Sequence, residues 1–189
     1  MLPEGSYTSA IALELNRLMN DAALAQPDAV DSFADRLLRA NRVFVAGAGR
    51  SGLMGKAFAM RLMHLGIAAY VVGETITPGI AESDALVLGS GSGETASLTG
   101  MAQKAKRLGA SVLLVTVNPD SPLSRLADET AVLPAAAKDA APGSGTTIQP
   151  MGSLFEQGLL VFYDAVVLKM MERRQMSGSA MYGSHANLE

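Results

Sequence analysis

Residues 85–95 read ALVLGSGSGET, an apolar run that leads directly into a turn rich in glycine and serine. The pattern of an amphipathic helix follows from Ala96 to Leu108. A short apolar run without alternation is typical of a strand that is buried on both faces of a parallel sheet. The stretch therefore predicts a strand, a turn and a helix in succession.

The same succession recurs along the middle of the chain. Four further apolar runs end in turn residues: VFVA from Val43, AAYVV from Ala68, SVLLVTV from Ser111 and ETAVLP from Glu129. Buried strands that alternate with helices form a parallel sheet with right-handed crossovers. We therefore predict an α/β fold, a doubly wound, five-stranded parallel sheet flanked by helices in a flavodoxin-like sandwich, with a helix after each run.

Further helical patterns flank this core. Two of them precede the first strand, with apolar residues from Ile11 to Met19 and from Val30 to Leu38. The last runs from Met151 to Arg174 and is apolar on so many sides that we expect it to be buried. The 17 residues from Pro134 to Pro150 show no period, and loops of that length are usually functional or disordered.

Length and composition restrict the class of protein. The chain has 189 residues, which predicts one domain over 1–189 at roughly 100–200 residues per domain. Hydrophobic residues make up 49% of the chain and charged residues 17%, where about 25% charged is usual. So little charged surface predicts a homo-oligomer, because subunit contacts would cover the remaining apolar faces.

Charge and residue types argue against several functions. The net charge is −3 without a cluster of Lys and Arg, so we expect no nucleic-acid partner. No segment approaches the ~18 apolar residues of a membrane span, and the start of the chain lacks the pattern of a secretory signal. We therefore expect a cytoplasmic protein without a membrane partner. With no cysteine and only two histidines, we expect no metal site.

The turn after the first predicted strand reads GAGRSG, residues 47–52, and satisfies the G-x-G-x-x-G pattern of dinucleotide-binding proteins. Glu74 ends the next predicted strand, about where an acid would bind a ribose. Glycines that simply make a tight strand-to-helix turn would explain the same pattern. Arg50 within the turn would contact either a ligand phosphate or a neighbouring subunit. From the sequence, both interpretations of GAGRSG and both contacts of Arg50 stay open.

The turn SGSGET, residues 90–95, is more specific. Its three hydroxyls, from Ser90, Ser92 and Thr95, converge on one predicted helix N-terminus. First-turn amides have no intrahelical partner and lie at the positive end of the helix dipole, so they bind phosphate readily, whereas capping needs only one hydroxyl. Both glycine-rich turns lie at the carboxyl edge of the sheet. This arrangement suits a compact phosphorylated ligand better than an extended dinucleotide.

Glu156 is the most unusual charge in the sequence. It shares one face of the last predicted helix with Leu160, Tyr163 and Val167. A carboxylate that faces a crevice and is partly shielded from water is suited to general-base catalysis. An acid in the first turn of a helix is also favourable where it faces water, so that interpretation stays open.

The two histidines lie far apart in the sequence. For His185, four residues from the C-terminus, a solvated tail histidine and a residue that transfers protons or binds substrate are equally open interpretations. His64 falls with Lys56 and Arg61 in the polar sector of the helical pattern Leu53–Leu65. We expect His64 to be solvated or to lie in the last turn of that helix.

Four motifs together resemble the sugar isomerase (SIS) domain family over nearly the whole chain: GAGRSG, SGSGET, QPMGSLFEQ (residues 149–157) and the terminal HANLE (185–189). The resemblance implies a cytoplasmic homotetramer that converts 3-hexulose 6-phosphate into fructose 6-phosphate, in formaldehyde fixation through the ribulose monophosphate pathway. It implies no metal and no redox cofactor. Glu156 would be the proton acceptor, and His185 an active-site residue supplied by the same or a neighbouring subunit. The implied substrate-binding residues are Gly49, Arg50, Ser51, Ser90, Gly91, Ser92, Gly93, Glu94 and Thr95.

Other functions on the same fold stay open from the sequence. A non-catalytic sugar-phosphate sensor usually carries a helix-turn-helix domain with a basic recognition helix, which is not visible in this sequence. An isomerase of a heptose phosphate would be expected to show additional metal-binding histidines. An arabinose phosphate isomerase commonly has extra regulatory domains. Nucleotide binding without phosphosugar binding would instead favour the dinucleotide interpretation.

Overall fold

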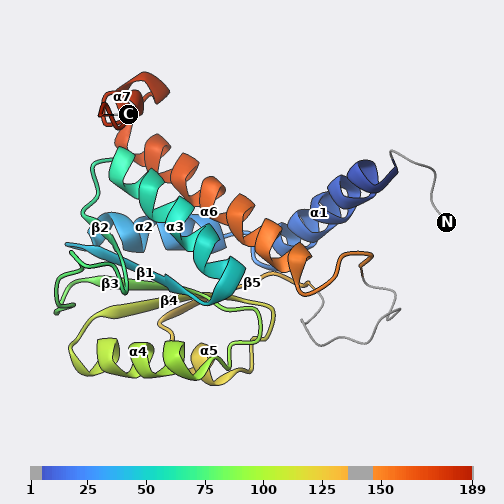
Figure 1. Ribbon diagram of the computed structural model, residues 1–189, viewed down its shortest axis with the longest axis horizontal. Helices are drawn as coiled ribbons and strands as arrows, with labels where there is room; N and C mark the ends of the chain where they lie inside the picture. The colour runs from blue at the N-terminus through green and yellow to red at the C-terminus, as the bar shows by residue number, and fades with distance from the viewer. Residues whose placement is uncertain (1–5, 136–146, 189) are drawn as a thin grey trace.

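The computed structural model describes residues 6–135 and 147–188 and contains one parallel sheet (Figure 1). The strand order is β2-β1-β3-β4-β5. The strands are β1 (Val43–Gly47), β2 (Ala69–Val71), β3 (Ala85–Gly89), β4 (Ser111–Thr116) and β5 (Glu129–Val132). Every strand pair is parallel. The predicted α/β fold with a five-stranded parallel sheet is therefore confirmed.

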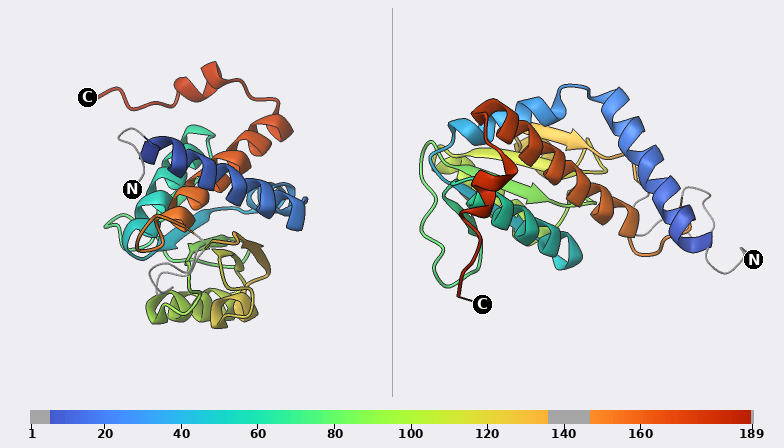
Figure 2. Two further views of the ribbon diagram at one scale, coloured as in Figure 1. Left: turned by 90° about the vertical axis from the view of Figure 1, so that its right-hand side faces the viewer. Right: turned by 90° about the horizontal axis from the view of Figure 1, so that it is seen from above.

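Helices cover both faces of this sheet (Figures 1 and 2). On one face lie α2 (Ala29–Arg39), α3 (Gly49–His64) and α6 (Ser153–Arg174), with α1 (Ser6–Ala25) packed against α6. On the other face lie α4 (Ala96–Arg107) and α5 (Pro122–Leu126). The short α7 (Gly178–Tyr182) follows α6 beside the end of α3.

Alternation along the strands builds a core on each side of the sheet. Val45 and Val87 pack among the side chains of α2, α3 and α6, whereas Phe44 and Leu88 pack against α4. Successive side chains of a strand point to opposite faces, so each strand contributes to both cores. This double burial explains why the strands read as continuous apolar runs rather than as alternating ones.

Three expected elements differ in the structure. α3 begins at Gly49, so GRSG forms its first turn; a Cβ at Gly52 would lie 2.6 Å from the Gly47 carbonyl oxygen, and only glycine allows this approach. α6 begins at Ser153 and not at Met151 as expected. Met151 and Gly152 have φ angles of +61° and +77°, which a right-handed helix does not allow. No helix lies between β2 and β3, where residues 72–84 form a connection with Pro78 at its centre.

Two further expectations concern the remaining segments. The helices before the sheet are confirmed as α1 and α2, separated at Pro27. Of the segment without period, 134–150, residues 136–146 lie outside the described residues. Within the described part of the chain, none of the helices combines the length and apolar character that crossing a membrane requires.

Candidate active site

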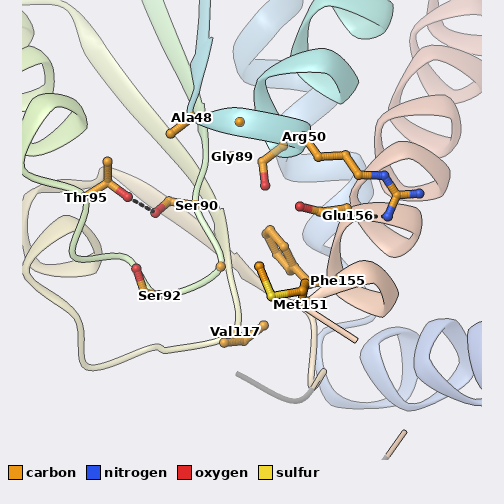
Figure 3. Close-up of a pocket in the computed structure, with 14 residues that line it drawn as sticks. Ala48, Arg50, Gly89, Ser90, Ser92, Thr95, Val117, Met151, Phe155 and Glu156 are labelled. Carbon is orange, nitrogen blue, oxygen red and sulfur yellow. Dashed lines mark hydrogen bonds and ion pairs between the residues drawn. The ribbon is translucent and has the colours of Figure 1, made fainter. Parts of the chain in front are cut away.

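The site lies where the strand order reverses. β1 and β3 are neighbours in the sheet, but their crossovers leave on opposite sides, and ligands of open α/β sheets bind in the crevice at that edge. A cavity of about 210 Å³ opens there, between the ends of β1 and β3 and the start of α6 (Figure 3). It is lined by Ala48, Gly49, Arg50, Ser51, Gly89, Ser90, Gly91, Ser92, Thr95, Val117, Met151, Gly152, Phe155 and Glu156.

Hydrogen bonds from the backbone amides of the turn 90–95 to its own serine hydroxyls stabilise its conformation. The Ser90 hydroxyl is buried and accepts a hydrogen bond from the Gly93 amide at 3.2 Å, and it lies 3.4 Å from the hydroxyl of Thr95. The hydroxyl of Ser92 accepts from the Glu94 amide at 3.2 Å and is exposed. Ser90, Ser92 and Thr95 therefore gather on one side of the cavity, as predicted (Figure 3).

The end of β4 and the segment that follows it donate hydrogen bonds to the turn 90–95 on the side away from the cavity. The Thr116 hydroxyl donates to the Gly91 carbonyl at 3.0 Å, and the Leu123 amide donates to the Gly93 carbonyl at 3.1 Å. Gly93 has a φ angle of +67°, and a Cβ on it would lie 2.1 Å from the hydroxyl oxygen of Ser121. Gly93 is thus a close-packed backbone position behind the cavity wall.

Three helices begin at this cavity without a side-chain cap. In the described residues, neither α3 after Ala48, nor α4 after Thr95, nor α6 after Gly152 has a side chain that accepts from its first-turn amides. By contrast, Ser121 caps α5 away from the cavity. Uncapped first-turn amides at the positive ends of helix dipoles bind anions. The cavity is therefore suited to a phosphate group.

Glu156 lies on the other side of the cavity from the hydroxyls (Figure 3). It stands in the first turn of α6, its side chain is 15% exposed, and Phe155 beside it is buried. A carboxylate oxygen of Glu156 lies 2.9 Å from a guanidinium nitrogen of Arg50, which comes from the first turn of α3. The cavity thus brings together a shielded carboxylate, an arginine and an anion-binding turn.

Eight of the predicted site residues line the cavity: Gly49, Arg50, Ser51, Ser90, Gly91, Ser92, Thr95 and Glu156. Gly93 and Glu94 do not line it: Gly93 lies behind the turn, and the side chain of Glu94 is exposed outside the cavity lining. Six further lining residues are not among those predicted from the sequence: Ala48, Gly89, Val117, Met151, Gly152 and Phe155. The motif QPMGSLFEQ contains three of these residues, and its glycine before an apolar helix was the signal for them.

Glu74 does not line the cavity. It is exposed, and its carboxylate pairs with the ammonium of Lys56 at 2.8 Å. The dinucleotide interpretation of GAGRSG therefore loses its ribose-binding acid.

The histidines lie at the other end of α3. Arg50 is in the first turn of this helix and His64 is its last residue, about 21 Å further along the axis at ~1.5 Å per residue. His185 stacks on His64, with ring centroids 5.5 Å apart, so it does not meet Glu156 of the same chain. Of the two positions expected for His64, the last turn of its helix is confirmed, and the solvated one does not apply, because His64 is 5% exposed beneath the C-terminal segment.

Known proteins resemble this chain over almost its full length. It is 52% identical to the 3-hexulose-6-phosphate isomerase of Bacillus subtilis (strain 168), with 96% of this chain and 98% of the relative covered. It is 42% identical to the 3-hexulose-6-phosphate isomerase of Mycobacterium gastri, with coverage of 96% and 91%. A crystal structure from Methanococcus jannaschii, reported to infer a molecular function of 3-hexulose-6-phosphate isomerase, has 32% identity and a TM-score of 0.82 over 97% of this chain and 99% of that one.

The family assignment follows from these matches. Residues 36–160 match the family model described as SIS domain, and this range contains both glycine-rich turns and Glu156. Together with relatives of such identity and coverage, the match shows that this chain belongs to the SIS domain family.

Proposed function

We propose that this protein is a 3-hexulose-6-phosphate isomerase, which converts 3-hexulose 6-phosphate into fructose 6-phosphate. The observation that carries the proposal is one cavity with an uncapped, hydroxyl-rich turn on one side and the carboxylate of Glu156 on the other. The names of the relatives that are 52% and 42% identical over nearly the full chain support the choice of substrate.

The phosphate group binds at the turn 90–95. Ser90, Ser92 and Thr95 supply hydroxyl donors, and the first-turn amides of α3 and α4 supply backbone donors. Ser51, in the first turn of α3, also lines the cavity. These groups add no negative charge, so they favour a phosphate dianion.

Glu156 transfers the proton between two carbon atoms. The substrate carries its carbonyl at C3 and the product at C2, so a base must take the C2 proton and return it to C3 through an enediolate. One carboxylate performs both transfers. The proton of the O2 hydroxyl moves to O3 in the same reaction, and donors near these oxygens stabilise the enediolate. Arg50, which borders Glu156, is placed to contact this part of the sugar.

The substrate reaches the site in its open-chain form. A five-membered ring on the C3 carbonyl would need a free O6 hydroxyl, and O6 carries the phosphate. In the direction that starts from 3-hexulose 6-phosphate, no ring-opening step is therefore needed before proton transfer, and a histidine is available for another role. We assign to His185 either the movement of the proton between O2 and O3 or assistance to ring closure of the product.

His185 serves the cavity of a neighbouring subunit. Within one chain it lies at the opposite end of α3 from Glu156, so it meets a cavity only across a subunit contact. Large apolar side chains support such a contact because they are exposed on the two helices between these sites: Leu53, Met60, Met63, Val161 and Leu168. We infer a cytoplasmic homotetramer, formed by the whole chain as one domain, that acts in formaldehyde fixation.

The test is isomerase activity of the purified protein, run without added metal from fructose 6-phosphate toward the 3-keto sugar. Glu156→Gln keeps the size of the side chain and removes the base, so we expect kcat to fall by about 10²–10⁴-fold while phosphosugar binding persists. Gln103→Ala, on the exposed side of α4, is the control and retains activity.

Two results would contradict the proposal. Binding of fructose 6-phosphate without turnover in the parent protein would indicate a sensor or an isomerase of another phosphosugar, and heptulose and pentulose phosphates would then be assayed. Full activity of the Glu156→Gln variant would instead exclude Glu156 as the base.

A further inference from the structure

A cluster of aromatic and titratable side chains lies between the C-terminal end of α3 and the C-terminal segment 177–188. The ring of His185 stacks on the ring of His64, with centroids 5.5 Å apart and an angle of 18° between the planes. Tyr182 also stacks on His185, at 5.9 Å and 27°. Arg61 of α3 and Asp164 of α6 are the other charged groups that line this hollow of about 400 Å³.

The protonation state of His64 follows from its contact with Arg61. A guanidinium nitrogen of Arg61 lies 3.3 Å from Nδ1 of His64. A guanidinium only donates hydrogen bonds, so Nδ1 must accept, and the ring is then neutral with its proton on Nε2. Burial, the charge of Arg61 and the proximity of His185 all lower the pKa of His64, in agreement with this geometry. The ring on which His185 stacks is therefore the neutral imidazole of His64.

The contacts of His185 define its own reactive nitrogen. Its Nδ1 lies 3.0 Å from the carbonyl oxygen of Ala186, and a carbonyl only accepts, so Nδ1 carries a proton. Nε2 is then the nitrogen that takes up or releases a proton. This is the form that a proton-transferring histidine needs.

We propose that His64 is a positioning residue for His185: its neutral ring, oriented by Arg61, holds the segment 177–188 on α3 and keeps Nε2 of His185 available for proton exchange at a neighbouring subunit's cavity. This inference rests on the proposed function and on the role assigned there to His185. A protonated His64 would lie next to the Arg61 guanidinium and would repel it. His64 would then lose the contact that orients its ring.

The two contacts of His64, with His185 and with Arg61, explain why a histidine occupies the buried last position of α3. A phenylalanine would offer the same flat face to His185 but no acceptor for Arg61, so it would stack without being oriented. An alanine would remove the face as well. Two variants therefore separate the two contributions: His64→Ala removes stacking and orientation, and His64→Phe removes orientation only.

The experiment measures kcat and KM of His64→Ala, His185→Ala and the double variant, with fructose 6-phosphate as substrate. Because a small displacement of a catalytic group is costly, we expect His64→Ala to lower kcat by about 10- to 100-fold with an unchanged KM. His64→Phe should recover part of that loss. The double variant should match His185→Ala alone, because His64 acts only through His185.

Hydrogen exchange of the amides in residues 178–185 gives a readout that does not depend on turnover. We expect faster exchange there in His64→Ala, with the amides of β3 and β4 unchanged, since these strands form the centre of the fold. An active parent enzyme whose His64→Ala variant keeps its tail protection, or whose double variant loses the product of the two single losses, would overturn this inference alone. A parent without isomerase activity would overturn the proposed function and this inference together.

Discussion

The guanidinium of Arg50 lies 2.9 Å from the carboxylate of Glu156, so the first turns of α3 and α6 are joined across the cavity. The Arg50 side chain is 47% exposed and that of Glu156 is 15% exposed. An ion pair with one partner largely in water adds little to stability. We therefore expect the pair to matter for ligand binding, because it holds the carboxylate in position and places a cation at the cavity.

Replacing Arg50 should affect the substrate more than the fold. For Arg50→Ala we expect KM for fructose 6-phosphate to rise by about tenfold, because a cation near a dianionic ligand is lost. The free energy of unfolding should change by less than about 1 kcal/mol. Arg50→Lys keeps the charge and should lie between the two. Steady-state kinetics and urea unfolding check this, and an unchanged KM in Arg50→Ala would contradict it.

Gly93 should tolerate no side chain. In Gly93→Ala the Cβ would lie 2.1 Å from the Ser121 hydroxyl oxygen, at a φ of +67°, so the turn 90–95 must move. We expect phosphosugar binding to be lost and the protein to be destabilised by roughly 1–3 kcal/mol, the range for a strained backbone position.

Gly100 provides the matched control for this substitution. It lies inside α4, and an added Cβ would meet no atom within 4 Å in the described residues. Gly100→Ala should therefore stabilise the protein by about 0.5–1 kcal/mol, because alanine favours the helix. Thermal unfolding of both variants tests the pair, and equal effects would contradict the close packing of Gly93.

Ser90 and Ser92 should respond differently to loss of the hydroxyl. Ser92 is exposed at the cavity, so Ser92→Ala should weaken binding of fructose 6-phosphate with little change in stability. Ser90 is buried and accepts from the Gly93 amide, so Ser90→Ala should also cost about 1–3 kcal/mol of stability by leaving that amide unsatisfied. Titration calorimetry and urea unfolding separate the two effects, and equal stability losses would contradict this assignment.

Glu14 on α1 should make stability depend on pH. Its carboxylate accepts from the Thr147 hydroxyl and the Ile148 amide, each at 2.7 Å, and from the Gln149 side chain at 3.0 Å. Burial raises the pKa of Glu14, but these hydrogen bonds and the charge of Arg17 outweigh it and lower the pKa below its ordinary value of 4.5. The ionised carboxylate therefore stabilises the fold above that value, and the contribution is lost as the pH falls through the lowered pKa.

Urea unfolding at pH 7 and at pH 3 tests this effect. Glu14→Gln should be less stable than the parent at pH 7, and the difference should shrink at pH 3. Asp21→Asn, an exposed acid on the same helix, is the control and should change stability little at either pH. A difference between Glu14→Gln and the parent that is equal at both values would contradict the prediction.

Local patterns explain which features could be predicted from the sequence. A strand covered on both faces needs apolar residues at consecutive positions, so β1, β3 and β4 were visible as runs. Ser90, Ser92 and Thr95 are close in the sequence and belong to one turn, so their hydroxyls also lie close together at the cavity. Glu156 was found because a charge within an apolar stripe is unusual, and the structure places it in the cavity wall.

Other features escaped prediction because they depend on contacts between distant segments. The start of α6 was misplaced because the left-handed Met151 is not a residue type that signals such a backbone. Whether His64 is solvated stays open from the sequence, because the segment that covers it comes from the other end of the chain.

The sequence by itself determined the sheet, the two glycine-rich turns and the residue types of the cavity, because burial period and turn chemistry are properties of neighbouring residues. Only the tertiary structure decided that Ser92 faces the cavity while Gly93 faces Ser121, that Arg50 meets Glu156, and that His185 lies on His64. These pairs come from different elements. The distances between these residues depend on the crossover connections and on helix packing against the sheet. A local sequence pattern carries no information about either.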